Sequence, residues 1–446
     1  MITHLSFILT NKRALLFILA ISAIIVIDSN VINFYTYTNK ELHLSSKVAI
    51  FTIFSITFSI IAIVLLKVIE SYHFTSNYKQ KKAQNLVRYT AIASQLIVIA
   101  FLAAEIVQMA FLNVYNSNLT LLILFTSYVP SILFLLLLVL LLTGWFRSSK
   151  NFMIIAYAIS FSIVLVYLVV STVYVNVQFT YNPEWVQAKS LHNTLVNTTI
   201  SNLSFSFGTT LDALSLLSFV LVWIATVALL RQYRSRIGTT RFWVITMIPL
   251  IYFLFPFEIY FANFSETMLS GAPVIFSVIY ILLFSATKQV GGVLFSIVFL
   301  TAATKIKQSH LQNSLKIAAI GIAVVFSSLD INSLLYAAYP PYGVLTIMLM
   351  PLGSYSLFIG LFASARLASQ DKKLRGEFFQ SAEKQMAFLQ TLGKVQMEKE
   401  LEKSFKSILK HPSILEESKD DYRREENVRE LVQEVIDELR SKRNSR

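Results

Sequence analysis

The chain has 446 residues, of which 55% are hydrophobic and 14% are charged. Soluble domains carry about a quarter charged residues, so this composition excludes an ordinary soluble protein and indicates an integral membrane protein. The absence of cysteine excludes disulfides, thiolate metal ligands and cysteine nucleophiles.

Long apolar runs follow one another along the first 366 residues. Each has about 20 residues or more, which is enough to cross roughly 30 Å of hydrocarbon as a helix. The strands of a membrane barrel are shorter and alternate in polarity, so we predict an all-α, polytopic transmembrane helix bundle over residues 1–366. Its ten expected spans are 13–36, 48–70, 89–113, 119–146, 152–178, 209–230, 242–263, 272–305, 315–337 and 343–366.

The formal net charge of +13 is unevenly placed along these spans. If the N-terminus is cytoplasmic, 17 Lys and Arg flank the inner ends of the spans and 3 flank the outer ends. Lys and Arg concentrate on the cytoplasmic side of membrane proteins. The pattern therefore predicts a plasma-membrane protein with both termini in the cytoplasm, and the basic charge reflects the lipid bilayer as partner and no nucleic acid.

The eighth apolar run, 272–305, is too long for one bilayer crossing, because a straight helix of that length measures about 50 Å. Two interpretations compete. One helix kinks at a break formed by Gly291 and Gly292, or two segments meet at Lys288 as a re-entrant or eleventh crossing. The basic residues Lys305, Lys307 and Lys316 favour the kinked single helix.

The outer loops are predicted to be short, apart from residues 180–208. Acceptor patterns for N-linked glycans, N-x-Ser/Thr, include those at Asn118, Asn197 and Asn202. All three fall on the predicted outer side, so they are compatible with the predicted orientation.

Residues 367–446 differ in composition from the spans, with 17 Lys and Arg and 16 Asp and Glu. We predict a cytoplasmic tail with an amphipathic helix at about 371–410, a break at His411–Pro412, and a second amphipathic helix from Val428 to Leu439. Neither helix keeps a strict heptad, which favours packing on a partner or on each other over a long coiled coil.

A layer of ionisable residues is predicted inside the spans. Four carboxylates lie 15 or 16 residues from the inner ends of their spans, which is about 22–24 Å along the helix from the cytoplasmic end. One lysine lies at a similar depth. These residues are Asp28, Glu105, Glu258, Asp330 and Lys288. An intramembrane charge usually faces the protein interior or water, so we expect a polar cluster with Lys288 as a counter-ion.

The cluster has two interpretations. It forms a cation or proton site in an outward-opening cavity, where a break at Gly291–Gly292 would free backbone carbonyls for an ion, or it is a structural network that fixes helix packing. The sequence carries no phosphate-binding glycine loop, zincin helix or Ser-His-Asp pattern. We therefore predict no metal site, no cofactor and no enzymatic activity.

The last 160 residues contain segments that together resemble a known group of proteins. They are Val290 to Phe295, Tyr339-Pro340-Pro341-Tyr342-Gly343, Ser364 to Arg366, Asp371 to Arg375 and Leu392 to Glu400. They are similar to uncharacterised multi-spanning membrane proteins of ammonia-oxidising archaea. The resemblance implies a membrane location and an archaeal origin, and it carries over no site residues.

Two functions are compatible with these features. The first is a membrane sensor or scaffold whose helical tail, residues 371–446, binds a cytoplasmic protein, since a charged amphipathic tail of about 80 residues is not needed for simple transport. The second is a cation- or proton-coupled secondary transporter or channel that uses the intramembrane acidic cluster.

Overall fold

The computed structural model describes residues 11–38, 44–70, 78–149, 152–180, 185–187, 201–231, 238–254, 287–304, 309–329 and 339–370. The chain divides into two compact units, Met1–Val395 and Gln396–Arg446, and all of the described residues belong to the first. The predicted tail helices and the predicted loop residues Asn197 and Asn202 lie outside the described residues.

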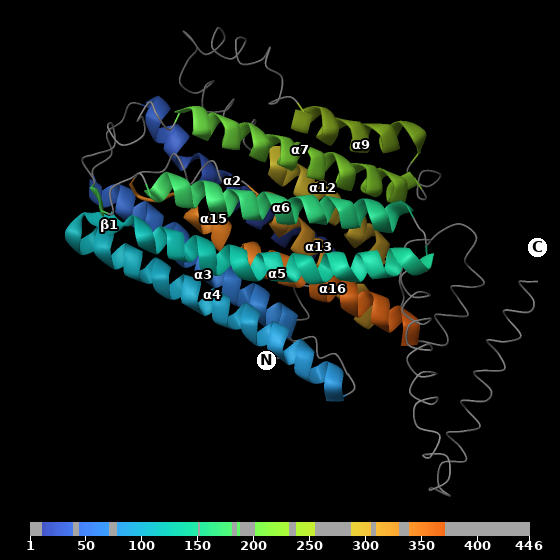
Figure 1. Cartoon of the computed structure of the whole chain (residues 1–446). Coiled ribbons are helices and arrows are strands. Elements are labelled where there is room, and N and C mark those ends of the chain that lie inside the picture. The colour runs from blue at the N-terminus through green and yellow to red at the C-terminus, as the bar shows by residue number, and fades with distance from the viewer. Residues whose placement is uncertain are drawn as a thin grey trace, which may run out of the picture. The chain divides into compact units, whose positions relative to one another are not determined.

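The described part is almost entirely helical (Figure 1). Its long helices are α2 (Asn11–Thr38), α3 (Leu44–Glu70), α4 (Tyr78–Leu112), α5 (Ser117–Ser149), α6 (Phe152–Thr180) and α7 (Ser201–Arg231). They are followed by α9 (Thr239–Leu254), α12 (Thr287–Thr304), α13 (Ser309–Ser327), the short α15 (Val344–Met348) and α16 (Met350–Gln370). Every predicted span overlaps one of these helices.

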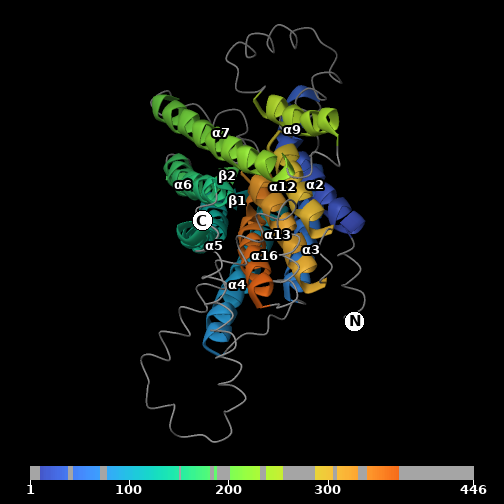
Figure 2. The same cartoon turned by 90° about the vertical axis from the view of Figure 1, so that its right-hand side faces the viewer.

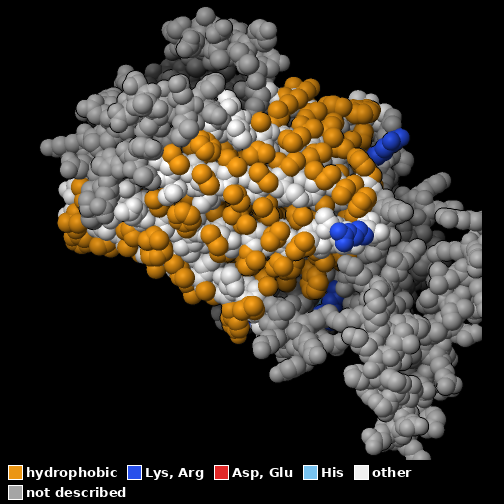
Figure 3. All heavy atoms as spheres, in the orientation of Figure 1, with side chains coloured by type: hydrophobic (Ala, Val, Ile, Leu, Met, Phe, Trp, Pro, Cys, Tyr) orange, Lys and Arg blue, Asp and Glu red, His pale blue; other side chains and the backbone are white. Residues whose placement is uncertain are grey.

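Seven of the helices in the described part are long and apolar enough to cross a membrane, and α9 and α12 contribute two shorter apolar segments. Their outward faces are hydrophobic. On α3, Ile53, Ile56, Ile60 and Ile63 are all exposed, as expected for side chains that contact lipid. Figure 3 shows hydrophobic side chains over most of the visible described face, with the visible Lys and Arg near one end. This confirms a helical protein with several helices that could span a membrane, whereas the number and direction of the crossings stay predictions.

A two-stranded ladder departs from the predicted all-α fold. Strand β1 (Val114–Asn116) links α4 to α5 and pairs antiparallel with β2 (Trp185–Gln187), with Tyr115 opposite Val186. We call the end of the bundle that carries this ladder the β end. Arg147 and Arg231, in the last turns of α5 and α7, lie at the opposite end.

Helices α13 and α16 form the centre of the bundle, with the other helices around them (Figure 2). Within the apolar windows of these two helices, 83% and 94% of the residues are buried. The pair is antiparallel and joined by glycines: a Cβ at Gly321 would overlap the backbone of Leu357, and one at Gly360 would lie 2.5 Å from the amide nitrogen of Ala318. The absence of side chains at these positions lets the two backbones touch.

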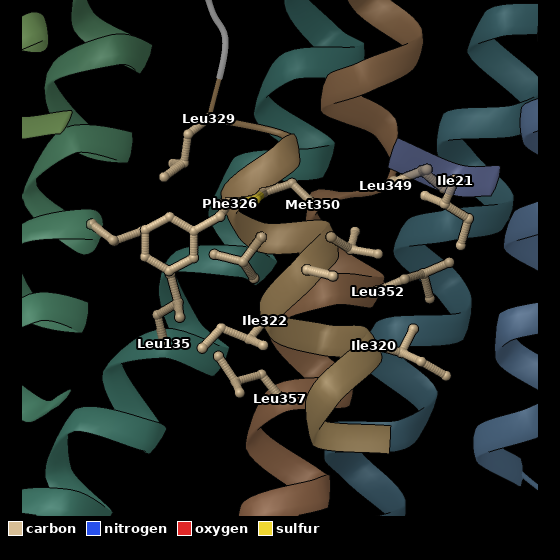
Figure 4. Packing of buried hydrophobic residues seen from close by; sticks show 14 of the residues in the cluster. Ile21, Leu135, Ile320, Ile322, Phe326, Leu329, Leu349, Met350, Leu352 and Leu357 are labelled. Carbon is tan, nitrogen blue, oxygen red and sulfur yellow. The ribbon is translucent and has the colours of Figure 1, made fainter. Parts of the chain in front are cut away.

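Apolar side chains fill the space around this central contact. Figure 4 shows Ile322 and Phe326 of α13 beside Met350 and Leu357 of α16, with Leu135 of α5 to one side. All of these side chains are at least 98% buried, so the centre of the bundle is closely packed apolar material.

The predicted helix break at Gly291–Gly292 is not found. Both glycines lie inside the continuous helix α12, which is described from Thr287. A Cβ at Gly291 would overlap the ring of Phe219, and one at Gly292 would lie 2.9 Å from the carbonyl oxygen of Ala323. These glycines therefore serve close helix contact, and the course of residues 255–286 lies outside the described residues.

Candidate functional site

Asp28 lies on α2, where its side chain is fully buried. Its Oδ2 accepts a hydrogen bond of 2.9 Å from the hydroxyl of Thr346, and the backbone N–H groups of Thr346 and Gly343 also stabilise the carboxylate. Thr346 is in the first turn of α15, which starts after Gly343 in a left-handed conformation with φ 87°. Asp28 thus fixes the start of α15 to α2.

The chain just before α15 is anchored on two further helices. The Tyr339 hydroxyl donates to the carbonyl oxygen of Met109 on α4 at 3.2 Å, and the Tyr342 hydroxyl donates to that of Lys47 on α3 at 3.1 Å. Both tyrosines are buried, and Tyr342 also packs edge-on against Phe51. The segment Tyr339 to Gly343 is therefore a junction between α3, α4 and α15.

Lys288 lies in the first turn of α12 and points at the end of α13. Its Nζ donates to the carbonyl oxygen of Leu329 at 3.2 Å, and the Tyr167 hydroxyl donates to the same oxygen at 2.6 Å. Leu329 follows α13 by two residues, and the carbonyl groups in the last turn of a helix carry partial negative charge. An ammonium group at this position is therefore favourable.

The glycine contacts show which residues lie at the same level as Leu329. Because α13 and α16 are antiparallel, the neighbours of Gly321 and Gly360 place Leu349 level with Leu329, and Thr346 of α15 precedes Leu349 by three residues, or about one helical turn. On the other side, Gly292 lies against Ala323 and Phe326, so Gln289, one turn earlier in α12, reaches the level of Ser327 and Ser328. A contact of 3.4 Å between the hydroxyls of Ser22 and Ser327 brings α2 to the same place.

Several polar atoms within about one helical turn of this level have no hydrogen-bond partner. They are Oδ1 of Asp28, both amide atoms of Gln289 and the hydroxyl of Ser328, and each belongs to a buried residue. Buried polar groups are normally paired, so this group of unpaired atoms favours a place for water or a small polar ligand. We refer to Asp28, Lys288, Gln289, Ser328 and Leu329 as the α13-end site.

Glu105 belongs to a different part of the bundle. It is fully buried on α4 and accepts a hydrogen bond from the Thr120 hydroxyl in the first turns of α5, while its Oε2 has no partner. Burial raises the pKa of the nearby Tyr115 phenol, and the negative charge of the Glu105 carboxylate adds a smaller increase. The Tyr115 ring lies 6.1 Å from that of Tyr339, measured between ring centroids.

The described contacts thus place the predicted polar residues in two sites. Asp28 and Lys288 belong to the α13-end site, and Glu105 lies apart from it with Thr120. Glu258 and Asp330 lie outside the described residues. The contact described for Lys288 is with a backbone carbonyl, so its role as counter-ion to the acids stays a prediction.

The predicted polar cluster contained only charged residues, and it therefore missed the uncharged residues of both sites. Thr346, Thr120 and Gln289 are uncharged, yet they supply the partners or the unpaired atoms of both sites. The sequence does carry a signal for Gln289, because a glutamine beside a lysine in an apolar run is costly in a membrane unless it faces the protein interior.

No group of three or more His, Cys, Asp or Glu that could hold a metal ion occurs among the residues that the structure describes. No protein-family model, curated protein or solved structure matches this chain. The resemblance to the archaeal membrane proteins therefore stays a prediction.

Proposed function

We propose that this protein is a cation- or proton-coupled secondary transporter or channel that binds its ion at the α13-end site. The observation that carries the proposal is the set of buried, unpaired polar atoms within about one helical turn of the end of α13. A purely structural network is expected to satisfy its members, because an unsatisfied buried group costs stability.

The chemistry of the α13-end site suits a proton or a hard cation. Its oxygen atoms come from a carboxylate, a backbone carbonyl, a hydroxyl and an amide, which are the ligands that such cations prefer. Thr346 bonds only one oxygen of Asp28. The other oxygen can therefore take a proton or contact a cation while the bond to Thr346 is kept.

Ion flux tests the proposal directly. The full chain is reconstituted in liposomes, and uptake of protons, sodium and potassium is measured with an imposed membrane potential. We expect uptake of one of these ions above protein-free liposomes and a loss of at least about ten-fold in Asp28→Asn, which corresponds to about 1.4 kcal/mol. Glu70→Gln is the matched control, because Glu70 pairs with Arg88 at the opposite end of the bundle.

Two outcomes would contradict transport. One is no uptake of any of the three ions above the protein-free background. The other is uptake that Asp28→Asn leaves unchanged.

Water access to the α13-end site gives an independent test. Because the chain has no cysteine, Asp28→Cys, Gln289→Cys and Ser328→Cys each introduce a single thiol. A membrane-impermeant thiol reagent added to the outside of right-side-out vesicles is expected to label at least one of them. A thiol placed at exposed Asn118 on the β end serves as the positive control, and protection of all three site positions beside a labelled control would indicate a dry network.

The orientation used in that test is part of the proposal. In this proposal the protein lies in the plasma membrane, its β end faces the outside of the cell, and both termini lie in the cytoplasm. The support is that Lys67, Arg88, Arg147 and Arg231 all lie near the end opposite to the ladder, as expected for the cytoplasmic side. Labelling of Asn118→Cys from the inside alone would reverse the orientation.

A second candidate function, a membrane sensor or scaffold, is favoured by the composition of residues 371–446. This segment combines nearly balanced charge with amphipathic patterns, which suits docking on a partner protein. The full chain and a variant that ends at residue 370 are compared for co-purification of cytoplasmic proteins. Loss of one stoichiometric partner in the shortened chain would support the sensor, and identical sets would contradict it.

A further inference from the structure

Helices α4 and α5 run antiparallel, and the bond between Glu105 and Thr120 defines how they are aligned. Glu105 of α4 bonds Thr120 of α5 near the β end, and Ala91 and Phe134 belong to one buried apolar cluster further along. The rise per residue is the same along both helices, so this bond sets the alignment. It places Gln95 of α4 level with Ser131 of α5.

The α4 side of this contact is a single buried stripe that includes two polar residues. Gln95, Val98, Leu102 and Glu105 follow one another at steps of three and four residues and are all buried, which places them on one helix face. The rise between Gln95 and Glu105 is about 15 Å. The stripe therefore carries polar groups from the β end to the middle of the bundle.

The α5 side supplies polar groups between them. Thr120, Ser127 and Ser131 are separated by seven and four residues, lie on one helix face, and are fully buried. Close to them, Pro130 interrupts the backbone bonding of α5, because proline has no N–H to donate to the carbonyl of residue 126.

Four polar atoms in this contact have no hydrogen-bond partner: Oε2 of Glu105, the hydroxyl of Ser127, and both amide atoms of Gln95. We call the contact lined by Gln95, Glu105, Thr120, Ser127 and Ser131 the α4–α5 seam. An interior that leaves so many polar atoms unpaired along one line is expected to contain ordered water, since each water can bond several of them.

We propose that the α4–α5 seam holds a file of water molecules that leads from Glu105 to Gln95 and passes protons to and from Glu105. A protonated water transfers one proton to the Glu105 carboxylate and becomes a neutral water, and the reverse step releases the proton. The seam is separate from the α13-end site. Its role as a proton path rests on the proposed transport function, whereas the presence of water rests on the seam alone.

Isotope exchange at a single thiol tests for the water. Ser127→Cys is nearly isosteric and introduces the only thiol of the chain, and its S–H stretch is followed by infrared spectroscopy after transfer to D2O. The control is Ser55→Cys on α3, since Ser55 is also buried but its hydroxyl is satisfied by the carbonyl of Phe51 at 2.7 Å. We expect exchange at least ten-fold faster at position 127 than at position 55.

Equal rates at positions 127 and 55 would overturn the proposal. If Ser127→Cys does not fold, Gln95→Cys, at the other residue of the seam whose side-chain polar atoms all lack partners, is measured in the same way and decides the matter by the same criterion. Gln95→Leu adds a thermal test in detergent. In a hydrated seam the leucine loses bonds to water and lowers the Tm, whereas in a dry seam it removes an unpaired amide and raises the Tm.

These measurements separate the two proposals. Fast exchange in a protein without ion flux would support the water file and contradict the transport function. Slow exchange in a protein that transports ions would contradict the water file and would leave the α13-end site as the proposed ion path.

Discussion

The α13–α16 contact and the α4–α5 seam are both antiparallel helix contacts with buried residues, but they are built in opposite ways. In the first, Gly321, Gly353 and Gly360 bring two backbones together and leave no room between them. In the second, glutamine, glutamate and serine side chains stand between the helices with unpaired atoms. Small residues exclude water and make a rigid contact, whereas long polar side chains keep space that water can occupy.

The largest expected effect is at the glycine contact. In Gly321→Leu the new side chain meets the backbone of Leu357 and the carbonyl of Gly353, neither of which can move aside in a packed centre. We expect a destabilisation of about 3 kcal/mol or more, seen as loss of the monodisperse peak in gel filtration of the detergent-solubilised protein. Ala20→Leu, on an exposed face of α2, is the control, and a Gly321→Leu protein that elutes and melts like the unmodified chain would break the comparison.

A smaller effect is expected where α15 extends the central pair. Asp28→Ala removes the acceptor of the Thr346 hydroxyl, and we expect a cost of about 1.5–3 kcal/mol in thermal unfolding in detergent. Thr346→Val is expected to cost a similar amount, and the double variant should cost no more than the worse single one, because both remove the same bond. Additive losses would show that the two side chains act independently.

The equivalent substitution in the seam sharpens the contrast. Thr120→Val removes the hydroxyl that bonds Glu105, but in a hydrated seam a water can replace the lost donor. We therefore expect less than about 1 kcal/mol in the same unfolding assay. A loss of about 1.5–3 kcal/mol, as for a buried hydrogen bond that water does not replace, would mean that the seam is dry.

The smallest effect is expected at the end of α4 away from the seam. Arg88 and Glu70 form an ion pair of 2.9 Å in which each side chain is 36% exposed. Surface pairs contribute about 0–1 kcal/mol, so Arg88→Met is expected to shift the Tm by no more than a few degrees, and the shift should shrink as salt is added. A large shift that salt does not change would place this pair among the buried polar contacts.

The sequence predicted the helices well because long apolar runs have few alternatives in a membrane. It also predicted that Asp28 and Glu105 are buried. It could not predict their partners, because depth along a helix says nothing of which helix lies beside it. Thr346 and Thr120 come from neighbouring helices. The sequence alone groups the acids by their depth, and it therefore puts Asp28 and Glu105 in one cluster, whereas the described contacts place them in two sites.

The glycines of α12 show a second limit of the sequence. A glycine pair in an apolar helix has the same local pattern whether it breaks the helix or lets another helix approach. The structure resolves this for Gly291 and Gly292, whose neighbours are Phe219 and Ala323. The α4–α5 seam was missed for a related reason, since Gln95 is uncharged and only its burial without partners distinguishes it from an ordinary surface glutamine.

The bond between Thr120 and Glu105 also bears on carbohydrate attachment at the β end. Asn118, Leu119 and Thr120 form one acceptor pattern for an N-linked glycan, and the Asn118 side chain is exposed. The threonine that completes the pattern, however, is fully buried and its hydroxyl is held by Glu105. A glycosyltransferase that must contact this threonine can act only on the newly made chain, before α4 and α5 close against each other.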